Sequence, residues 1–477
     1  MSRAGRDPGT PPSPVRRQIV ALLVAYSFMT WLNRVSMSVA YDERIKGQFD
    51  IPPPAMGWVY SAFVFAYMLC MTPGGLLIDR YGAWLALVVM GFGSALFAAL
   101  TGAAGHPALA GGGRVLVLLV GIRLLMGALT APVYPAGSRL VANWLPVARR
   151  SGANGMIQGA AAVGIACTFP LFGALIDLVD WPSAFVVSGT VTAVVALAWT
   201  VCGADDPSQR RWLDAILSRS AADTPHDPRS SAGDARTAVM SARQPVAELP
   251  ADEAVAPPLW RHRSLILLTA SYGAIGYVEY LFFFWMHYYF EGVLRLGTVR
   301  SRHYAAVLML ALAGGMVLGG FLADRLRARD NGRRRYAIVP AVGMCAGAVL
   351  LVLGTHATKV AWIVTLLALA LAAVGAAEAP VWTVATELGG RRGGTAAAVC
   401  NTGANLGGLV SPVVTQLVSD WFSRQGGLDE TTGWRLGIGL GSVVAIAGAV
   451  PWLWIRPAER PDESEGDTPG ADQRQRA

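Results

Sequence analysis

Long apolar segments recur along the whole chain, and short polar stretches separate them. Each segment holds roughly 20 residues, enough for an α-helix to cross the hydrocarbon core of a bilayer. Soluble domains do not repeat apolar runs of this length. The pattern therefore predicts an all-α membrane protein with twelve transmembrane helices, at residues 18–40, 55–78, 84–102, 115–136, 152–176, 182–202, 264–290, 304–322, 336–353, 360–386, 395–421 and 436–455.

A polar stretch at 203–263 divides the helices into two halves of six, 18–202 and 264–455. It is rich in Ala, Asp, Ser, Pro and Arg and lacks apolar periodicity, so we expect a mostly disordered cytoplasmic loop with a short surface helix near 212–217. The tails, 1–17 and 456–477, are polar as well. Because the first apolar segment is too long for a signal-peptide core, we expect it to stay attached as the first helix.

Composition and charge agree with a lipid environment. Hydrophobic residues make up 53% of the chain, charged residues 15%, and the mean hydropathy is +0.43. With the N-terminus placed inside, the tails and even-numbered loops hold 28 of the 39 Lys and Arg residues. The positive-inside rule then puts both termini in the cytoplasm of a cell with the protein in its inner (plasma) membrane. Arg295, Arg300 and Arg302, in one outer loop, are the exception.

Other classes of function lack their motifs. The basic residues are scattered over loops, so the net charge of +8 does not indicate nucleic acid. The chain has no phosphate-binding loop, no nucleophile elbow and no metal-binding H-E-x-x-H pattern, and its five cysteines have no C-x-x-C spacing. We expect a monomer that is not an enzyme, with no cofactor and no metal site.

One short motif occurs after the second helix and again after the eighth. The first copy reads G-L-L-I-D-R-Y-G at 75–82, and the second reads G-F-L-A-D-R at 320–325. The glycine permits close helix contact, the aspartate can accept from a helix N-terminus and the arginine can clamp across a loop. The residues of this conformational loop are Gly75, Asp79, Arg80, Gly82, Asp324 and Arg325.

This repeated loop resembles the signature of the major facilitator superfamily, over nearly the whole chain. The resemblance implies two halves related by an axis along the membrane normal, a solute site at the midplane between them, and a loop that latches the halves. Further motifs resemble the anion:cation symporter branch, whose members carry organic acids: N-R-V-S-M-S-V-A at 33–40, R-x-x-x-G leading to A-P-V-Y-P-A at 123–136, and N-T-G-A-N-L-G-G at 401–408.

Arg34 is the first candidate for binding an organic anion. An arginine inside a membrane helix costs several kcal/mol unless it faces water, a partner or a ligand. Its planar guanidinium matches a carboxylate in two parallel hydrogen bonds. Trp31 and Ser38 share its helical face and add an aromatic wall and a hydroxyl. The alternative is that Arg34 extends to the outer interface.

The titratable residues are candidates for coupling to protons. The symporter branch has an Asp and a Glu where this chain has Asn33 and Thr130, which do not titrate near neutral pH. Glu378, which begins an E-A-P sequence at a predicted helix break, and Glu279 are the carboxyl groups in apolar segments that could replace them. The alternative for Glu378 is a static ion pair with Arg123 or Arg34.

Two further coupling candidates have structural alternatives. Arg123 matches a helix-4 position that the resemblance associates with coupling, yet it could anchor the helix at the outer interface. His287 lies among aromatic residues typical of a membrane interface, and this interfacial role is its alternative. The remaining substrate-binding candidates are Tyr134, Gln158, Tyr277, Trp382, Asn401 and Asn405; the two asparagines could instead join neighbouring helices.

The sequence thus predicts a secondary transporter that moves a small organic anion, such as a sugar acid or an aromatic acid, by alternating access with proton coupling. A uniporter or exchanger of the same solutes is the alternative, since the usual acids are missing. A transporter-like solute sensor that signals through 203–263 is a third.

Overall fold

The computed structural model is built from helices joined by short connections. It describes residues 13–51, 53–105, 112–207, 209, 261–329, 337–424 and 426–455. These ranges contain no strand, which agrees with the predicted all-α architecture. Most of the predicted central loop and tails, including the surface helix near 212–217, lie outside the described residues.

The first half of the chain contains a short helix at one end of the bundle and seven longer helices. The short one, α2 (Lys46–Phe49), follows a π-helical turn, Tyr41–Ile45. The longer helices are α1 (Ser13–Ala40), α3 (Pro53–Tyr81), α4 (Ala83–Ala103), α5 (Gly112–Thr130), α6 (Val133–Trp144), α7 (Arg150–Val179) and α8 (Trp181–Cys202).

The second half repeats this order without the short α2. Its helices are α11 (Arg263–Tyr288), α12 (Thr298–Ala328), α13 (Ile338–His356), α14 (Val360–Gly375), α15 (Glu378–Gly389), α16 (Gly393–Arg424) and α17 (Glu430–Ala449).

Helix length and hydropathy decide how many times the described chain can cross a membrane. Ten helical segments are long and apolar enough, or eleven if the bent α7 counts as one span. One of the ten, residues 360–423, is 64 residues long. At 1.5 Å per residue such a segment is about three times longer than the hydrocarbon core is thick. Dividing it at the turn Gly390–Arg392, which separates α15 from α16, brings the number to the predicted twelve.

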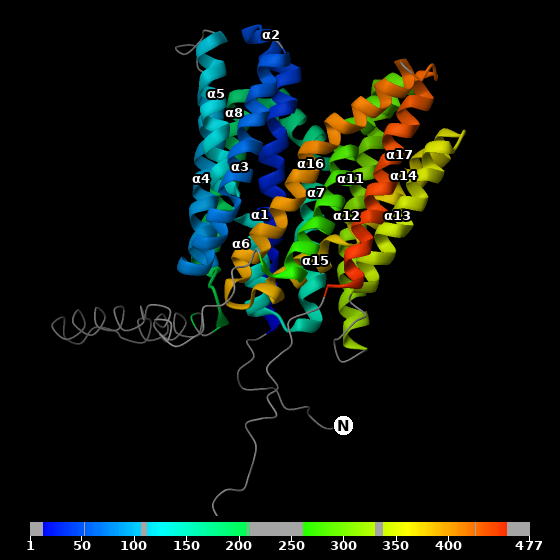
Figure 1. The fold of residues 1–477 in the computed structure, drawn as a ribbon. Helices are drawn as coiled ribbons and strands as arrows, with labels where there is room; N and C mark the ends of the chain where they lie inside the picture. Colours follow the sequence, from blue (N-terminus) through cyan, green and yellow to red (C-terminus); the bar gives the residue numbers. More distant parts are fainter. Residues whose placement is uncertain are drawn as a thin grey trace, which may run out of the picture.

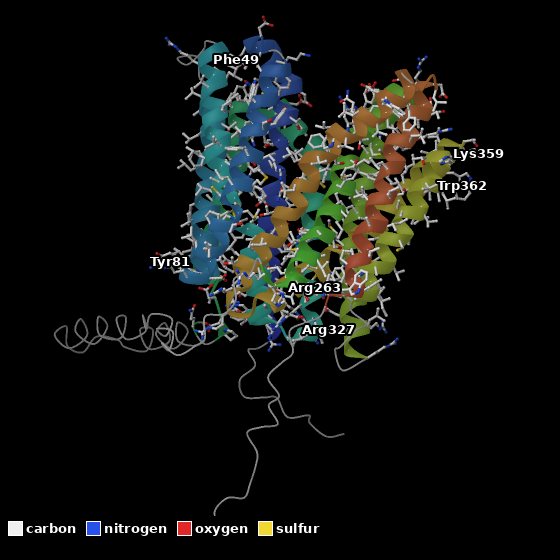
Figure 2. All side chains as sticks on the ribbon, viewed as in Figure 1. Phe49, Tyr81, Arg263, Arg327, Lys359 and Trp362 are labelled. Atoms are coloured by element: carbon white, nitrogen blue, oxygen red, sulfur yellow. The ribbon has the colours of Figure 1, made fainter. Side chains whose placement is uncertain are left out.

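The helices of each half form a bundle, and the two bundles stand side by side (Figure 1). They are close together at the lower end of the view, near α6 and α15, and diverge toward the upper end. Tyr81, Arg263 and Arg327 lie at the lower end, whereas Phe49 and Lys359 lie at the upper end (Figure 2). The connections therefore alternate between the two ends, as the topology predicts.

Large apolar side chains cover the outside of the bundles. Leu178, Val117 and Leu318 are each at least 70% exposed. Because no soluble protein of this size exposes apolar residues so widely, this surface suits contact with lipid tails.

One span in each half is interrupted at the corresponding place, and a proline accompanies both breaks; α7 bends separately, near Pro170. Helix α5 ends at Thr130 and α6 begins at Val133, directly after Pro132. In the second half α14 ends at Gly375 and α15 begins at Glu378. Proline cannot donate to the preceding turn, so it is tolerated at the start of the following helix. The second break places Glu378 in the first turn of α15, where it is buried.

Small residues allow the helices to approach closely, as membrane bundles require. At Gly315 on α12, an added Cβ would overlap the backbone of Ala372 on α14. The neighbouring Gly314 has nothing within 4 Å of the same position. These adjacent glycines therefore differ only in whether a helix packs against them.

We predict that Gly315→Ala lowers the free energy of unfolding by about 1–3 kcal/mol, because an added methyl group must separate α12 from α14. Gly314→Ala is the matched control and should change it little. Thermal unfolding of the purified protein in detergent measures both. Equal melting temperatures for the two variants would contradict the observed packing.

Candidate solute-binding site

A cavity of about 60 Å³, partly open to solvent, lies between the two halves. Helices α1, α3, α6 and α7 form one wall, and α11, α12, α15 and α16 form the other. Most of the predicted site residues line it, although they come from distant parts of the sequence. These are Trp31, Arg34, Tyr134, Gln158, Glu279, Glu378, Trp382, Asn401 and Asn405.

Arg34 presents its guanidinium to this cavity among aromatic rings. Its central carbon lies 4.5 Å from the ring centre of Trp31, 5.0 Å from that of Phe63 and 5.7 Å from that of Tyr67. One terminal nitrogen lies 3.5 Å from the hydroxyl of Tyr280, on the opposite half. The face of an aromatic ring attracts a cation but does not neutralise it. Arg34 therefore keeps hydrogen-bond donors and a positive charge for an anionic ligand.

Aromatic contacts join the two walls. Trp31 stacks on Phe283 with ring centres 5.8 Å apart, and Tyr134 lies 5.7 Å from Trp382. The indole nitrogen of Trp31 donates to the Tyr134 hydroxyl at 2.5 Å. These rings fix the width of the cavity and position Trp31 beside Arg34.

Glu378 and Glu279 bring two carboxyl groups to the opposite wall. Oε1 of Glu378 accepts from the hydroxyl of Tyr272 and, at 3.2 Å, from the indole of Trp382. Its Oε2 and Oε1 of Glu279 are buried without a hydrogen-bond partner. Among the described residues no ion pair joins either carboxyl group to Arg34 or Arg123, so the static pair considered for Glu378 is not formed here.

Arg123 lies behind Arg34 and does not line the cavity. It is 2% exposed, and its NH1 donates to the backbone oxygens of Asn33 at 3.1 Å and Arg34 at 3.5 Å. This burial excludes the alternative of an interfacial anchor in this conformation. Arg123 therefore ties α5 to the part of α1 that carries Arg34.

Asn33 and Thr130, which replace the acids of the symporter branch, are both used within the scaffold. The Asn33 amide donates to Thr192 at 2.8 Å and accepts from Ser188 at 2.6 Å, both on α8. The Thr130 hydroxyl donates to the carbonyl of Met126 on its own helix at 2.8 Å. Neither side chain lines the cavity.

The two asparagines of α16 line the cavity and also hold neighbours. Asn401 donates to the Tyr67 hydroxyl at 3.3 Å, across the two halves, and Asn405 donates to the backbone oxygen of Asn401 at 2.8 Å. Gln158 of α7 lines the same space. Their remaining amide groups can bind hydroxyls of a solute.

Besides Arg123, three predicted site residues are not in the cavity. The Ser38 hydroxyl donates to the carbonyl of Val35 on its own helix at 2.7 Å. Tyr277 contacts the hydroxyl of Thr415 at 3.3 Å, in the contact between α11 and α16. His287 pairs with Glu291 at 3.0 Å, with its side chain 42% exposed, which matches its interfacial alternative.

Sequence reasoning missed four aromatic residues of the cavity: Tyr67, Tyr272, Tyr280 and Phe283. For Tyr272 a signal was present, because it precedes Glu279 by two helical turns and so shares its face. Tyr67 had no comparable signal, since no other residue of its helix was a candidate for binding the solute or a proton.

The repeated loops connect the halves at the lower end of the bundle. Asp79, at the end of α3, accepts from the backbone nitrogens of Gly394 and Thr395 at 2.9 and 2.8 Å. Asp324, near the end of α12, accepts from those of Ser151 and Gly152 at 3.0 and 2.6 Å. Each half thus supplies a carboxylate to a helix N-terminus of the other half, where the helix dipole favours negative charge.

The glycines of the loop have the expected role, but its arginines do not. A Cβ on Gly75 would meet Ala398 of α16 at 2.7 Å, and Gly82 adopts a φ of +92° that favours glycine. Arg80 and Arg325 are exposed, and Arg80 lies over the ring of Tyr81.

Other arginines form the clamps that were expected of Arg80 and Arg325. Arg327 binds both carboxylate oxygens of Glu387, at 2.9 and 2.8 Å. Arg139 reaches the carbonyl of Gly390 in the other half at 2.5 Å.

Comparisons with known proteins identify the class of protein. The model of the Major Facilitator Superfamily matches residues 23–412, and the chain belongs to this superfamily. The chain is therefore a multi-pass membrane transporter, and the predictions of family, fold and a transporter rather than an enzyme are confirmed. A solved structure of a bacterial homologue of the human lysosomal transporter Spinster, inward-facing and unoccupied, has the same fold, with a TM-score of 0.57, 16% identity and coverage of 94% of this chain and 100% of that one.

The names of individual relatives are more specific than the name of the superfamily. The chain is 27% identical to a probable sulfoacetate transporter of Cupriavidus necator, over 95% of this chain and 97% of the relative. It is 24% identical to a probable galactarate/D-glucarate transporter of Bacillus subtilis, over 97% and 98%. It is 25% identical to a D-galactonate transporter of Escherichia coli, over 93% and 96%. All three relatives are named for organic acids.

We predict that Asp324→Asn loosens the lower end of the bundle, because it removes the charge from two hydrogen bonds between the halves. Hydrogen exchange at the amides of Ser151 and Gly152 should become faster, on the order of tenfold. Asp177→Asn is the control, because Asp177 pairs with Arg44 within the first half. Unchanged exchange in Asp324→Asn would show that these bonds do not hold the halves together.

Proposed function

We propose that the protein is a secondary transporter of a small organic anion, with Arg34 as the residue that binds the anionic group. The observation that carries this proposal is a guanidinium that faces a cavity between the two halves and has no carboxylate partner among the described residues. A cation in such a place attracts an anionic ligand. The names of the relatives support the same class of solute.

Alternating access then follows from the two-bundle design. The bonds of Asp79 and Asp324 hold the halves together at one end, and their release would open the cavity toward that end. By the distribution of basic residues this end is cytoplasmic, and both termini lie on that side. We propose a monomeric carrier in the inner membrane, since one chain supplies both walls of the cavity.

Proton coupling is assigned to Glu378 and Glu279 acting as a pair. They line the same cavity, where two negative charges repel each other, so protonation of one of the two carboxyl groups relieves the repulsion. The symporter branch has an Asp and a Glu at the positions of Asn33 and Thr130, and these two side chains do not titrate near neutral pH. The other titratable and charged groups near the pair are Arg34, Tyr67, Tyr134, Tyr272, Tyr280 and Cys400.

An exchanger or uniporter of the same solutes is the second candidate. The observation that favours it is the use of Asn33 and Thr130 in the scaffold, where their hydrogen bonds are satisfied without any proton transfer. Counterflow that persists without an ion gradient, together with uptake that ignores the gradient, would identify this candidate.

We predict that Arg34→Ala lowers uptake of galactonate, glucarate or sulfoacetate into proteoliposomes by at least about tenfold. Arg34→Lys should restore part of it, because an ammonium supplies the charge without the planar fork. The control is Arg44→Ala, which removes an exposed arginine from the outer end of the same helix region. Full uptake by Arg34→Ala would refute the anion site.

We also predict that Glu378→Gln and Glu279→Gln uncouple uptake from the proton gradient while leaving counterflow. An inside-alkaline gradient should accelerate uptake by the unaltered protein and by Asp177→Asn, but not by these two variants. Radiolabelled uptake at matched external pH measures the difference. If both glutamine variants remain fully gradient-driven, the proton binds elsewhere.

A further inference from the structure

The cavity carries opposite charges on its two walls, and these charges are not paired with each other. Arg34 belongs to the first half, and Glu279 and Glu378 belong to the second. Among the described residues no ion pair joins these groups. Arg34 contacts aromatic rings, while Oε2 of Glu378 and Oε1 of Glu279 have no hydrogen-bond partner.

Arg34 and Glu279 are half-buried and Glu378 is buried. A ligand that matches these charges stabilises them, because an uncompensated charge is costly where the dielectric is low. Glu378 is only 3% exposed. One proton shared by the two carboxyl groups removes one of their two charges and leaves the other. A simple organic anion would neutralise Arg34 but would leave this remaining negative charge unmatched.

Resting on the proposed function, we propose that the preferred substrate is zwitterionic, with an ammonium group in addition to the anionic group. Arg34 binds the carboxylate or sulfonate end. The ammonium end donates hydrogen bonds to Oε2 of Glu378 and Oε1 of Glu279. This arrangement supplies a partner to each orphaned oxygen and balances the charge of both walls.

The surroundings of Glu378 suit a cationic group. Tyr272 and Trp382 donate to its Oε1, which orients the carboxylate and leaves Oε2 for the ligand. The two rings lie 5.8 Å apart in an edge-to-face arrangement beside it. Aromatic faces stabilise ammonium groups, and no lysine, histidine or second arginine is among the described residues that line the cavity. Arg34, which binds the anionic end, is therefore the one cationic side chain among these described residues.

The test compares ligands that differ only in the amino group, by equilibrium binding to the full-length protein in nanodiscs. The probes are 3-aminopropanoate against propanoate, 4-aminobutanoate against butanoate, and 3-aminopropanesulfonate against propanesulfonate. We expect at least one amino compound to bind about tenfold more tightly than its partner, as two charge-assisted hydrogen bonds allow. Glu378→Gln should reduce this preference to less than about threefold.

Asp177→Asn is the matched control, because it removes one carboxylate outside the cavity, and its preference should equal that of the unaltered protein. Glu279→Gln is a second variant in case Glu378→Gln does not fold. Equal binding within every pair, binding of none of the probes, or a preference that survives both glutamine variants would overturn the zwitterion proposal.

These outcomes separate the two proposals. If both members of each pair bind equally and Arg34→Ala abolishes their binding, the anion-transporter proposal stands and only the ammonium site is refuted. Binding that Arg34→Ala does not weaken would refute the anion site itself. Sodium ions could also weaken binding of the amino compounds only, while the two members of each pair bind equally in sodium-free buffer. This result would assign the carboxyl pair to an inorganic cation and overturn the zwitterion proposal.

Discussion

The structure depends on the cost of placing charged side chains between two helix bundles in a membrane. A guanidinium and two carboxyl groups would each be expensive against lipid or in a packed core. They are accommodated because they face a common cavity whose walls supply hydroxyl, amide and aromatic groups. The same constraint explains why these charges are candidates for function. A static ion pair would have satisfied them within the protein, and none is formed between them in the part of the chain that the structure describes.

The cavity exists because the bundles are held apart in one region and together in another. Close packing through glycines, as between α11 and α16, keeps each bundle rigid, while Trp31 against Phe283 and Tyr134 against Trp382 span the gap between the halves. At the lower end Asp79 and Asp324 each cap a helix of the opposite half. These are a few polar contacts with the strength of hydrogen bonds, so they can break without unfolding either bundle.

The sequence was sufficient for the helices, the two halves and the principal charges of the site. Apolar length identified the spans, the A-P sequences identified the breaks before α6 and within the tenth predicted helix, and the unusual position of Arg34 identified the cavity. It did not predict how each helix is rotated about its own axis, and so which side chains face the cavity. Ser38, one turn from Arg34, turns back to its own helix, and Tyr277, two residues before Glu279, packs against α16. Rotation is set by packing against neighbours, which spacing along one helix does not encode. For the same reason the sequence did not predict that Arg139 and Arg327, rather than Arg80 and Arg325, make the contacts expected of the loop arginines.

The central claim is that Arg34 faces a site for organic anions. The most direct measurement is the thermal stability of the purified protein with sugar acids, sulfonates and neutral sugars, compared with Arg34→Ala. A ligand at 100 times its dissociation constant stabilises the folded state by about 2.7 kcal/mol. We expect one class of organic anions to raise the melting temperature of the unaltered protein, and Arg34→Ala to abolish the rise. Stabilisation by neutral sugars that persists in Arg34→Ala would contradict the account.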